Sequence, residues 1–315
     1  MPSGPTLRPA RSTAAVVAVV ALLGLAGVAV YGVLTIARAT PNQANGAPGN
    51  TPLANTGPLP ADVLAKVNTL SASGNAKPAE LIALLAPAIE ANPNEQDLRI
   101  ALAHAYVDQK DWPQAYKSFE AALAIGPETA PLQAEAGTVA NAAGLLDRAI
   151  EHYGRAKQLE PKNPVHPLYL GMIQIKAGKD RDAMTSLVTA TVLNPDLGAA
   201  WGSMGELELR NNQLDLAMQH LEKARKLEPE SLKWRIAEAK VHKRQNEPAK
   251  ALDLLVNLPE KQRYNADAIP VVADALAMLK QPDKRADYAK AAADFARKSG
   301  DQKALEQAER ITQPQ

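Results

Sequence analysis

Proline recurs at a fixed interval along most of this chain. Pro93, Pro127, Pro161, Pro195 and Pro229 stand 34 residues apart. A period of this size is typical of repeat architectures, in which each repeat buries its apolar face against its neighbours. The pattern therefore predicts one elongated array of repeats over most of the sequence.

Three small positions and one bulky position repeat with the prolines. The small positions are Ala103, Gly137, Gly171, Gly205 and Ala239, then Ala115, Ala149, Ala183, Ala217 and Ala251, then Ala88, Ala122, Ala156, Ala190 and Ala224. The bulky position is Leu85, Phe119, Tyr153, Leu187, Leu221 and Leu255. This pattern predicts an antiparallel pair of short amphipathic helices in each repeat. The first two small positions let the paired backbones approach, the third meets the next repeat, and the bulky residue fills the gap.

A turn is expected between the two helices of each pair. Lys110, Gly144, Gly178, Asn212 and Asn246 stand there. Glycine and asparagine tolerate the left-handed conformation that ends a helix, so four of these five residues suit the turn. The repeating proline then ends each unit, because it cannot continue a helix.

These positions carry a resemblance to a known family. Gln133, Ala136, Gly137, Ala140, Ala149, Tyr153, Ala156 and Pro161 follow the pattern W-x2-L-G-x2-Y, A-x3-F, P. Trp201, Met204 and Gly205 supply the start of that pattern in a later unit, and Leu102, Ala103 and Tyr106 in an earlier one. The chain therefore resembles tetratricopeptide-repeat (TPR) proteins.

The resemblance implies an all-α fold, a TPR α-solenoid of helix-turn-helix repeats spanning residues 61–298. Five units match well, from about Gln96 to Leu258, and a partial unit precedes them with Leu81 where alanine is expected. The pattern ends after Leu258, where Pro259 comes early, and helices expected at about 267–280 and 283–298 fit it loosely. Residues 299–315 are expected to hold a polar capping helix, at about 301–311, and a tail.

A membrane anchor is expected before the array. Ala14–Ala37 is an uncharged run long enough to cross a bilayer as a helix. Arg8 and Arg11 precede it and only Arg38 follows closely, which places residues 1–13 in the cytoplasm and the body outside. A cleaved signal peptide is the alternative, but the run exceeds the usual apolar region. Residues 38–60, rich in proline, glycine and asparagine, are expected to be a linker.

Charge and composition exclude several classes of function. The net charge is +1, and the first 61 residues hold three arginines and no acid, which leaves the body near neutral. Phosphate binding needs a basic surface, so nucleic acid is not expected as a partner. The chain has no cysteine, which removes disulfides, thiolate metal sites and thiol catalysis.

No motif for chemistry stands out. The sequence lacks HExxH, a P-loop, GxSxG and GxGxxG. Its five histidines do not form a spacing typical of a metal site. We therefore expect no catalytic residues, no cofactor and no metal, and histidines that are exposed or hydrogen-bonded within the fold.

Binding to other proteins is the expected function. In TPR proteins the first helix of each unit lines a concave groove, and its inward positions touch the ligand. The resemblance assigns to that groove Ile100, His104, Val107, Thr138, Asn141, Leu168, Met172, Ile175, Glu206, Leu209, Arg210, Lys233, Ile236, Lys240, Lys243 and Arg244. The groove would be apolar in the middle and basic towards its C-terminal end, which suits a peptide with an apolar face and an acidic end. The alternative is that these positions are ordinary packing and a solvated face.

We therefore expect the whole chain to be a scaffold on the bacterial inner membrane that acts in envelope protein assembly. Its TPR body would lie in the periplasm or outside the cell. Its architecture is similar to the TPR assembly factors of cytochrome c maturation, which implies an apocytochrome-binding chaperone as one alternative. An enzyme or an enzyme accessory subunit is the alternative of another class. It would need a convergent acid, base or metal set, which the sequence does not show.

Overall fold

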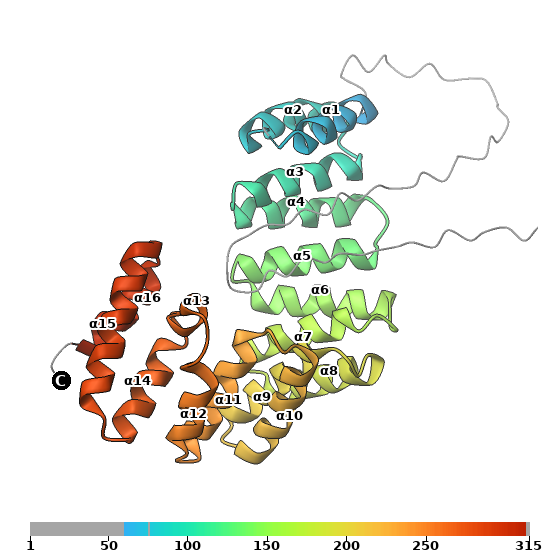
Figure 1. Cartoon of the computed structure of the whole chain (residues 1–315). Coiled ribbons are helices and arrows are strands. Elements are labelled where there is room, and N and C mark those ends of the chain that lie inside the picture. Colours follow the sequence, from blue (N-terminus) through green and yellow to red (C-terminus); the bar gives the residue numbers. More distant parts are fainter. Residues whose placement is uncertain (1–59, 75, 313–315) are drawn as a thin grey trace, which may run out of the picture. The chain divides into compact units, whose positions relative to one another are not determined.

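The structure is a computed structural model that describes residues 60–74 and 76–312. Within these residues the chain is all-helical (Figure 1). Its helices are α1 (Pro60–Ala72), α2 (Pro78–Ala91), α3 (Gln96–Asp108), α4 (Trp112–Ile125), α5 (Ala130–Ala142), α6 (Leu146–Leu159), α7 (Val165–Lys176), α8 (Asp180–Leu193), α9 (Gly198–Arg210), α10 (Leu214–Leu227), α11 (Leu232–Arg244), α12 (Pro248–Leu255), α13 (Glu260–Arg263), α14 (Ile269–Met278), α15 (Pro282–Ser299) and α16 (Gln302–Thr312). The expected all-α fold is confirmed for this part of the chain.

The segments predicted before the array lie almost wholly outside the described residues. These are residues 1–13, the anchor at Ala14–Ala37 and the linker up to Pro60, where α1 begins. None of the helices described from Pro60 onward is both long enough and apolar enough to cross a membrane.

The helices pack as pairs that stack in chain order. The contacting pairs are α1 with α2, α3 with α4, α5 with α6, α7 with α8, α9 with α10, α11 with α12 and α14 with α15. From α2 to α11, each second helix also packs against the first helix of the next pair. This is the helix-pair solenoid that the 34-residue period predicts.

The turn inside each pair is left-handed, as the sequence predicts. Gly144 and Gly178 have φ of 79° and 73°, and Lys110, Asn212 and Asn246 each have φ of 60°. In each turn the backbone N–H of the next residue donates to a carbonyl five residues earlier, for example from Leu145 to Ala140 at 2.8 Å. That bond satisfies a carbonyl that the end of the helix leaves without a partner.

The small and bulky positions meet as predicted. The bulky residues at Leu85, Phe119, Tyr153, Leu187, Leu221 and Leu255 are at most 2% exposed. A Cβ placed on Gly171 would lie 2.7 Å from Cγ of Leu187, and one on Gly205 would lie 2.6 Å from Cγ of Leu221. The first small position is therefore small because the bulky side chain of the same repeat occupies the adjoining space.

The repeat register continues beyond Leu258, where the side-chain pattern ends. Lys280 stands 34 residues after Asn246, has φ of 56°, and precedes the same backbone bond, from Gln281 to the carbonyl of Leu276 at 3.0 Å. The expectation that the pattern ends at Leu258 is therefore wrong for this turn. The second helix does change, because α12 is 8 residues long whereas α10 is 14. The short helix α13 and its loops make up the missing length.

The first helices of neighbouring repeats also contact one another. α1 contacts α3, α7 contacts α9, α9 contacts α11, and α11 contacts α14. Among the described helices, no two second helices of adjacent repeats approach as closely. Side-chain bonds link the two remaining pairs, α3 to α5 through His104 and Glu135, and α5 to α7 through Asn141 and Lys176. We call the surface formed by the first helices the first-helix face.

Candidate functional site

The predicted groove residues all lie on first helices. Ile100, His104 and Val107 are on α3, Thr138 and Asn141 on α5, Leu168, Met172 and Ile175 on α7, Glu206, Leu209 and Arg210 on α9, and Lys233, Ile236, Lys240, Lys243 and Arg244 on α11. Residues four or three apart on one helix share a face, so each helix presents its set together.

The apolar members divide into two groups. Leu168, Leu209 and Ile236 are buried, at 6%, 8% and 5% exposed, and belong to core clusters. For these three, ordinary packing accounts for the apolar side chain. Ile100, Val107, Met172 and Ile175 are only half-buried and keep surface that a partner can contact.

Helix α7 differs from the other first helices at two inward positions. In α7 these positions hold Met172 and Ile175, one turn apart. In the other described repeats from α3 to α14, at least one of the two equivalent residues is polar or charged. Met172 and Ile175 therefore form a strip without charge on this face. They pack against the cluster that contains Leu187 and Met204.

Most of the cations predicted at the C-terminal end of the groove have partners. Lys233 lies 2.8 Å from Glu206, and Lys243 lies 2.6 Å from Asp274 on the next first helix. These bonds tie neighbouring repeats together and neutralise the two lysines.

The arginines hold the end of the preceding first helix. Arg210 donates to the backbone carbonyl of Ile175 at 3.0 Å and pairs with Asp180. Arg244, one repeat later, donates to the carbonyl of Leu209. Carbonyls in the last turn of a helix lack a partner within the helix, and a cation near that end is favourable. Both arginines therefore have a structural role in the joint between repeats.

Lys240 is the exception among the predicted cations. It is exposed, and within the described residues it has neither an ion pair nor a hydrogen bond through its side chain. At the basic end of the groove, Lys240 is therefore the one ammonium group without a partner among the described residues, and the charge of Arg244, which bonds a backbone carbonyl, is not paired with an acid.

The N-terminal end of the groove is also internally bonded. Nε2 of His104 lies 2.7 Å from Oε2 of Glu135. Thr138 bonds the hydroxyl of Tyr153 at 2.6 Å, and Asn141 accepts a bond of 2.9 Å from Lys176. These side chains link α3, α5, α6 and α7, so some of their hydrogen-bonding groups already have partners within the fold.

The prediction missed two acids on this face, Glu135 and Asp274. Asp274 occupies the same position in its repeat as Lys240, 34 residues later, so the repeat period could have found it. It was missed because the pattern was followed only to Leu258. Glu135 lies one position from the inward set, and nothing in the repeat pattern marks it.

Each histidine has a carboxylate neighbour. Beyond His104, the pairs are His152 with Glu120 at 3.3 Å, His166 with Glu160 at 2.9 Å, His220 with Glu208 at 2.7 Å and His242 with Glu247 at 2.8 Å. Burial lowers the pKa of His152, which also bonds Gln133 at 2.6 Å. The described residues contain no group of His, Asp and Glu that could hold a metal ion.

Comparison with known proteins agrees with this architecture. Residues 98–131 match the tetratricopeptide repeat family, and this stretch covers one helix pair and the start of the next. No curated protein matches the sequence.

Several solved structures share the fold. A tetratricopeptide repeat protein from Parabacteroides merdae is 17% identical with a TM-score of 0.53, covering 70% of this chain and 94% of its own. PilF of Pseudomonas aeruginosa is 18% identical with a TM-score of 0.51, covering 68% and 96%. YrrB is 20% identical with a TM-score of 0.50, covering 58% and 90%. The resemblance is thereby confirmed: residues 98–131 are a tetratricopeptide repeat, and the described chain has the fold of tetratricopeptide-repeat proteins.

Proposed function

We propose that this protein is a scaffold that binds a segment of another protein on its first-helix face. The observation that carries the proposal is the uncharged strip of Met172 and Ile175 on α7. A half-buried apolar pair on a surface of connected helices suits the apolar face of an amphipathic segment. YrrB, which shares the fold, is described as having an unusual peptide-binding site.

The partner's chemistry follows from the free groups on the face. Its main contact is apolar, at α7 and at Ile100 and Val107 on α3. One acidic group opposite Lys240 would add a charge contact. Because Arg210, Lys233 and Lys243 are paired with acids, we expect a weaker dependence on salt than a fully basic groove would give.

The proposal extends to the segments before Pro60. The run Ala14–Ala37 would anchor the scaffold in the bacterial inner membrane, the linker would hold the body away from the bilayer, and the body would act in envelope protein assembly. The body would bind and position other proteins without catalysing a reaction itself. The uncharged run and the arginines before it support this arrangement.

The test is capture of the partner in cells by the full-length protein and three variants. Replacing Met172 and Ile175 together with Ser should reduce the captured partner strongly and equally at low and high salt. Lys240→Glu should reduce it mainly at low salt, while Lys117→Glu on α4 serves as the matched charge control. Capture of an apocytochrome would assign cytochrome c maturation, and capture of pilus or secretion components would assign another assembly pathway. Equal capture by all variants would contradict binding on this face.

A further inference from the structure

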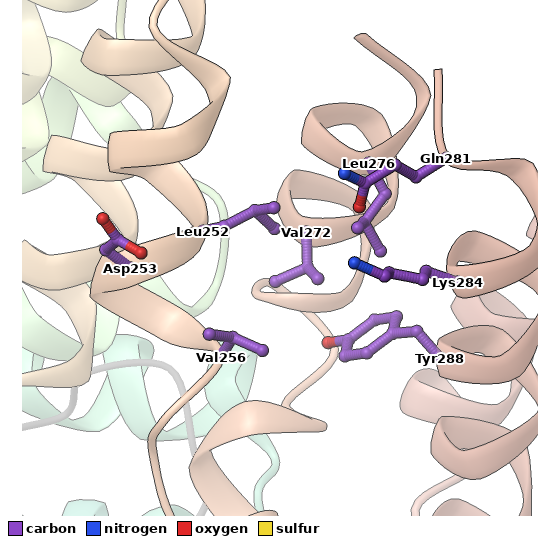
Figure 2. A pocket seen from close by; sticks show the side chains of 8 residues that line it. All are labelled: Leu252, Asp253, Val256, Val272, Leu276, Gln281, Lys284 and Tyr288. Carbon is purple, nitrogen blue, oxygen red and sulfur yellow. The ribbon is translucent and has the colours of Figure 1, made fainter. Parts of the chain in front are cut away.

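A cavity of about 310 Å³ lies between α12, α14 and α15 (Figure 2). Leu252 and Val256 reach into it from α12 and its end, Val272 and Leu276 from α14, and Tyr288 from α15. The cavity shares no residue with the groove predicted on the first-helix face. It is lined mainly by apolar side chains, at a place where two second helices flank a first helix.

The short helix α12 opens this cavity. α12 ends at Leu255 after 8 residues, whereas α4, α6, α8 and α10 each have 14. Val256, the first residue beyond it, lies at the cavity with 37% of its surface exposed. The chain then turns away into α13, so no further turn of α12 covers the space.

The equivalent junction one repeat earlier is filled by polar groups that bond one another. There Glu238 accepts two bonds of 2.8 Å from Arg225. His242 and Lys250 each lie 2.8 Å from Glu247. All of these side chains therefore have partners within the junction.

At the cavity the same repeat positions hold different chemistry. Val272 and Leu276 replace Glu238 and His242, so the floor is apolar. Lys284 stands at the position of Lys250, but no ion pair holds it within the described residues. Figure 2 shows its ammonium group extending from α15 toward α12. An unpaired cation over an apolar floor is a combination that the earlier junction does not have.

Further cations lie beside the cavity. Gln281 lines it and also lines a second hollow of about 420 Å³, together with Lys280 and Arg285. The Nε of Arg285 is buried and has no hydrogen-bond acceptor. Asp253, on α12, is the one acid among the described residues that line the two hollows. The charged residues that line the two hollows are therefore cationic at α15 and the turn before it, and anionic at α12.

We propose that this cavity binds the C-terminal residue of a partner protein. Its large apolar side chain would enter the cavity, whose volume lies at the lower end of the roughly 300–1,000 Å³ typical of ligand pockets and suits a single side chain. Its α-carboxylate would bond Lys284, with Lys280 and Arg285 adding positive charge nearby. Asp253 would accept from a backbone N–H upstream in the same peptide.

The rim carries both a cation, Lys284, and an acid, Asp253, and this combination favours a peptide C-terminus over a simple amphiphile. A fatty acid offers a carboxylate but no donor for Asp253, whereas a peptide end offers a carboxylate, an apolar side chain and N–H groups together. The proposal does not rest on the first-helix face, because the two sites have no residue in common.

The experiment measures binding of four labelled peptides to the full-length protein in detergent by fluorescence polarisation. The peptides are Gly-Ser-Gly-Ser-Gly-Leu with a free C-terminus, its amidated twin, and versions with a free C-terminal Phe or Lys. The free Leu and Phe peptides should bind, and amidation or a terminal Lys should weaken binding about tenfold, as expected for loss of a charged hydrogen bond or of the apolar contact. Decanoate is added as a competitor to test a simple amphiphile.

Variants locate the binding. Lys284→Glu and Val256→Asp should each weaken binding of the Leu peptide by about tenfold. Lys290→Glu, on the same helix, and Val192→Asp, on α8, are matched controls that should bind like the parent, with folding checked by circular dichroism. Equal binding of free and amidated peptides, no peptide binding, unchanged binding by Lys284→Glu, or binding of decanoate alone would each overturn the proposal.

Discussion

Two glycines inside helices offer a direct test of how the repeats pack. Gly171 lies on α7 and Gly154 on α6. A Cβ added to Gly171 would lie 2.7 Å from Cγ and 2.9 Å from Cδ2 of Leu187, and 3.2 Å from the carbonyl oxygen of Ala183. A Cβ added to Gly154 would meet nothing within 4 Å. Substitution by alanine at the two sites should therefore have opposite effects.

The magnitudes follow from two opposing contributions. Alanine is favoured over glycine in a helix interior by about 0.5–1 kcal/mol, so Gly154→Ala should raise the free energy of unfolding by that amount. At Gly171 the same gain is opposed by overpacking, which costs about 1–3 kcal/mol in a close-packed core. Leu187 is fully buried and cannot move aside without displacing its neighbours. Gly171→Ala should therefore lower stability by up to about 2 kcal/mol, and Gly171→Leu by more.

Urea denaturation of both alanine variants, followed by circular dichroism, measures the difference. A double-mutant cycle with Leu187→Ala identifies the contact, since Gly171→Ala should become neutral or stabilising once the leucine is shortened. If Gly171→Ala is as stable as Gly154→Ala, the assignment of the small position to the helix contact is wrong.

Three further predictions concern other parts of the chain. Lys110→Gly should raise the free energy of unfolding by up to about 1 kcal/mol, because glycine adopts φ of 60° without the steric cost, and the urea midpoint measures it. Burial raises the pKa of Glu238 above its ordinary 4.5, so the folded state binds that proton more tightly than the unfolded state does. The free energy of unfolding should therefore fall as pH rises from the unfolded-state pKa to the folded-state pKa. Glu238→Gln should reduce this dependence of the urea midpoint on pH. Full-length protein should fractionate with membranes, while a variant without residues 1–37 should not; finding both in the same fraction would contradict the anchor.

Much of the fold could be predicted because the period fixes it. Small residues such as Gly171 and bulky ones such as Leu187 report a contact within one repeat, and that contact recurs at the same spacing. The turn at Lys110 was predicted only by its place, since lysine does not favour a left-handed φ. The backbone bond from Asp111 to the carbonyl of Tyr106, together with the packed helices on both sides, holds it there.

The end of the array was harder to predict from side chains. Arg285 and Ala289 stand where the repeat expects a small and a bulky residue, so the side-chain pattern is absent there although the spacing continues to Lys280. The repeat register depends on the number of residues between equivalent turns. The shortened α12 followed by α13 keeps that number at 34.

The electrostatics of the candidate groove depend on contacts between repeats. Lys243 and Lys240 have the same charge and lie on one helix, yet only Lys243 meets an acid, Asp274, on the next first helix. The pattern of residues within one repeat does not predict such a pair. The pair joins first helices of adjacent repeats, so it depends on how those repeats pack.

The central claim, that a partner lies on the first-helix face at α7, is tested most directly by site-specific photo-crosslinking in cells. A photoreactive amino acid replaces Met172 in one variant of the full-length protein and Val192 in another. Val192, on the second helix α8, is 75% exposed and controls for chance encounters. We predict a crosslinked partner from position 172 and none from position 192. Crosslinking of the same partner from position 192 alone, or equally from both, would contradict the account.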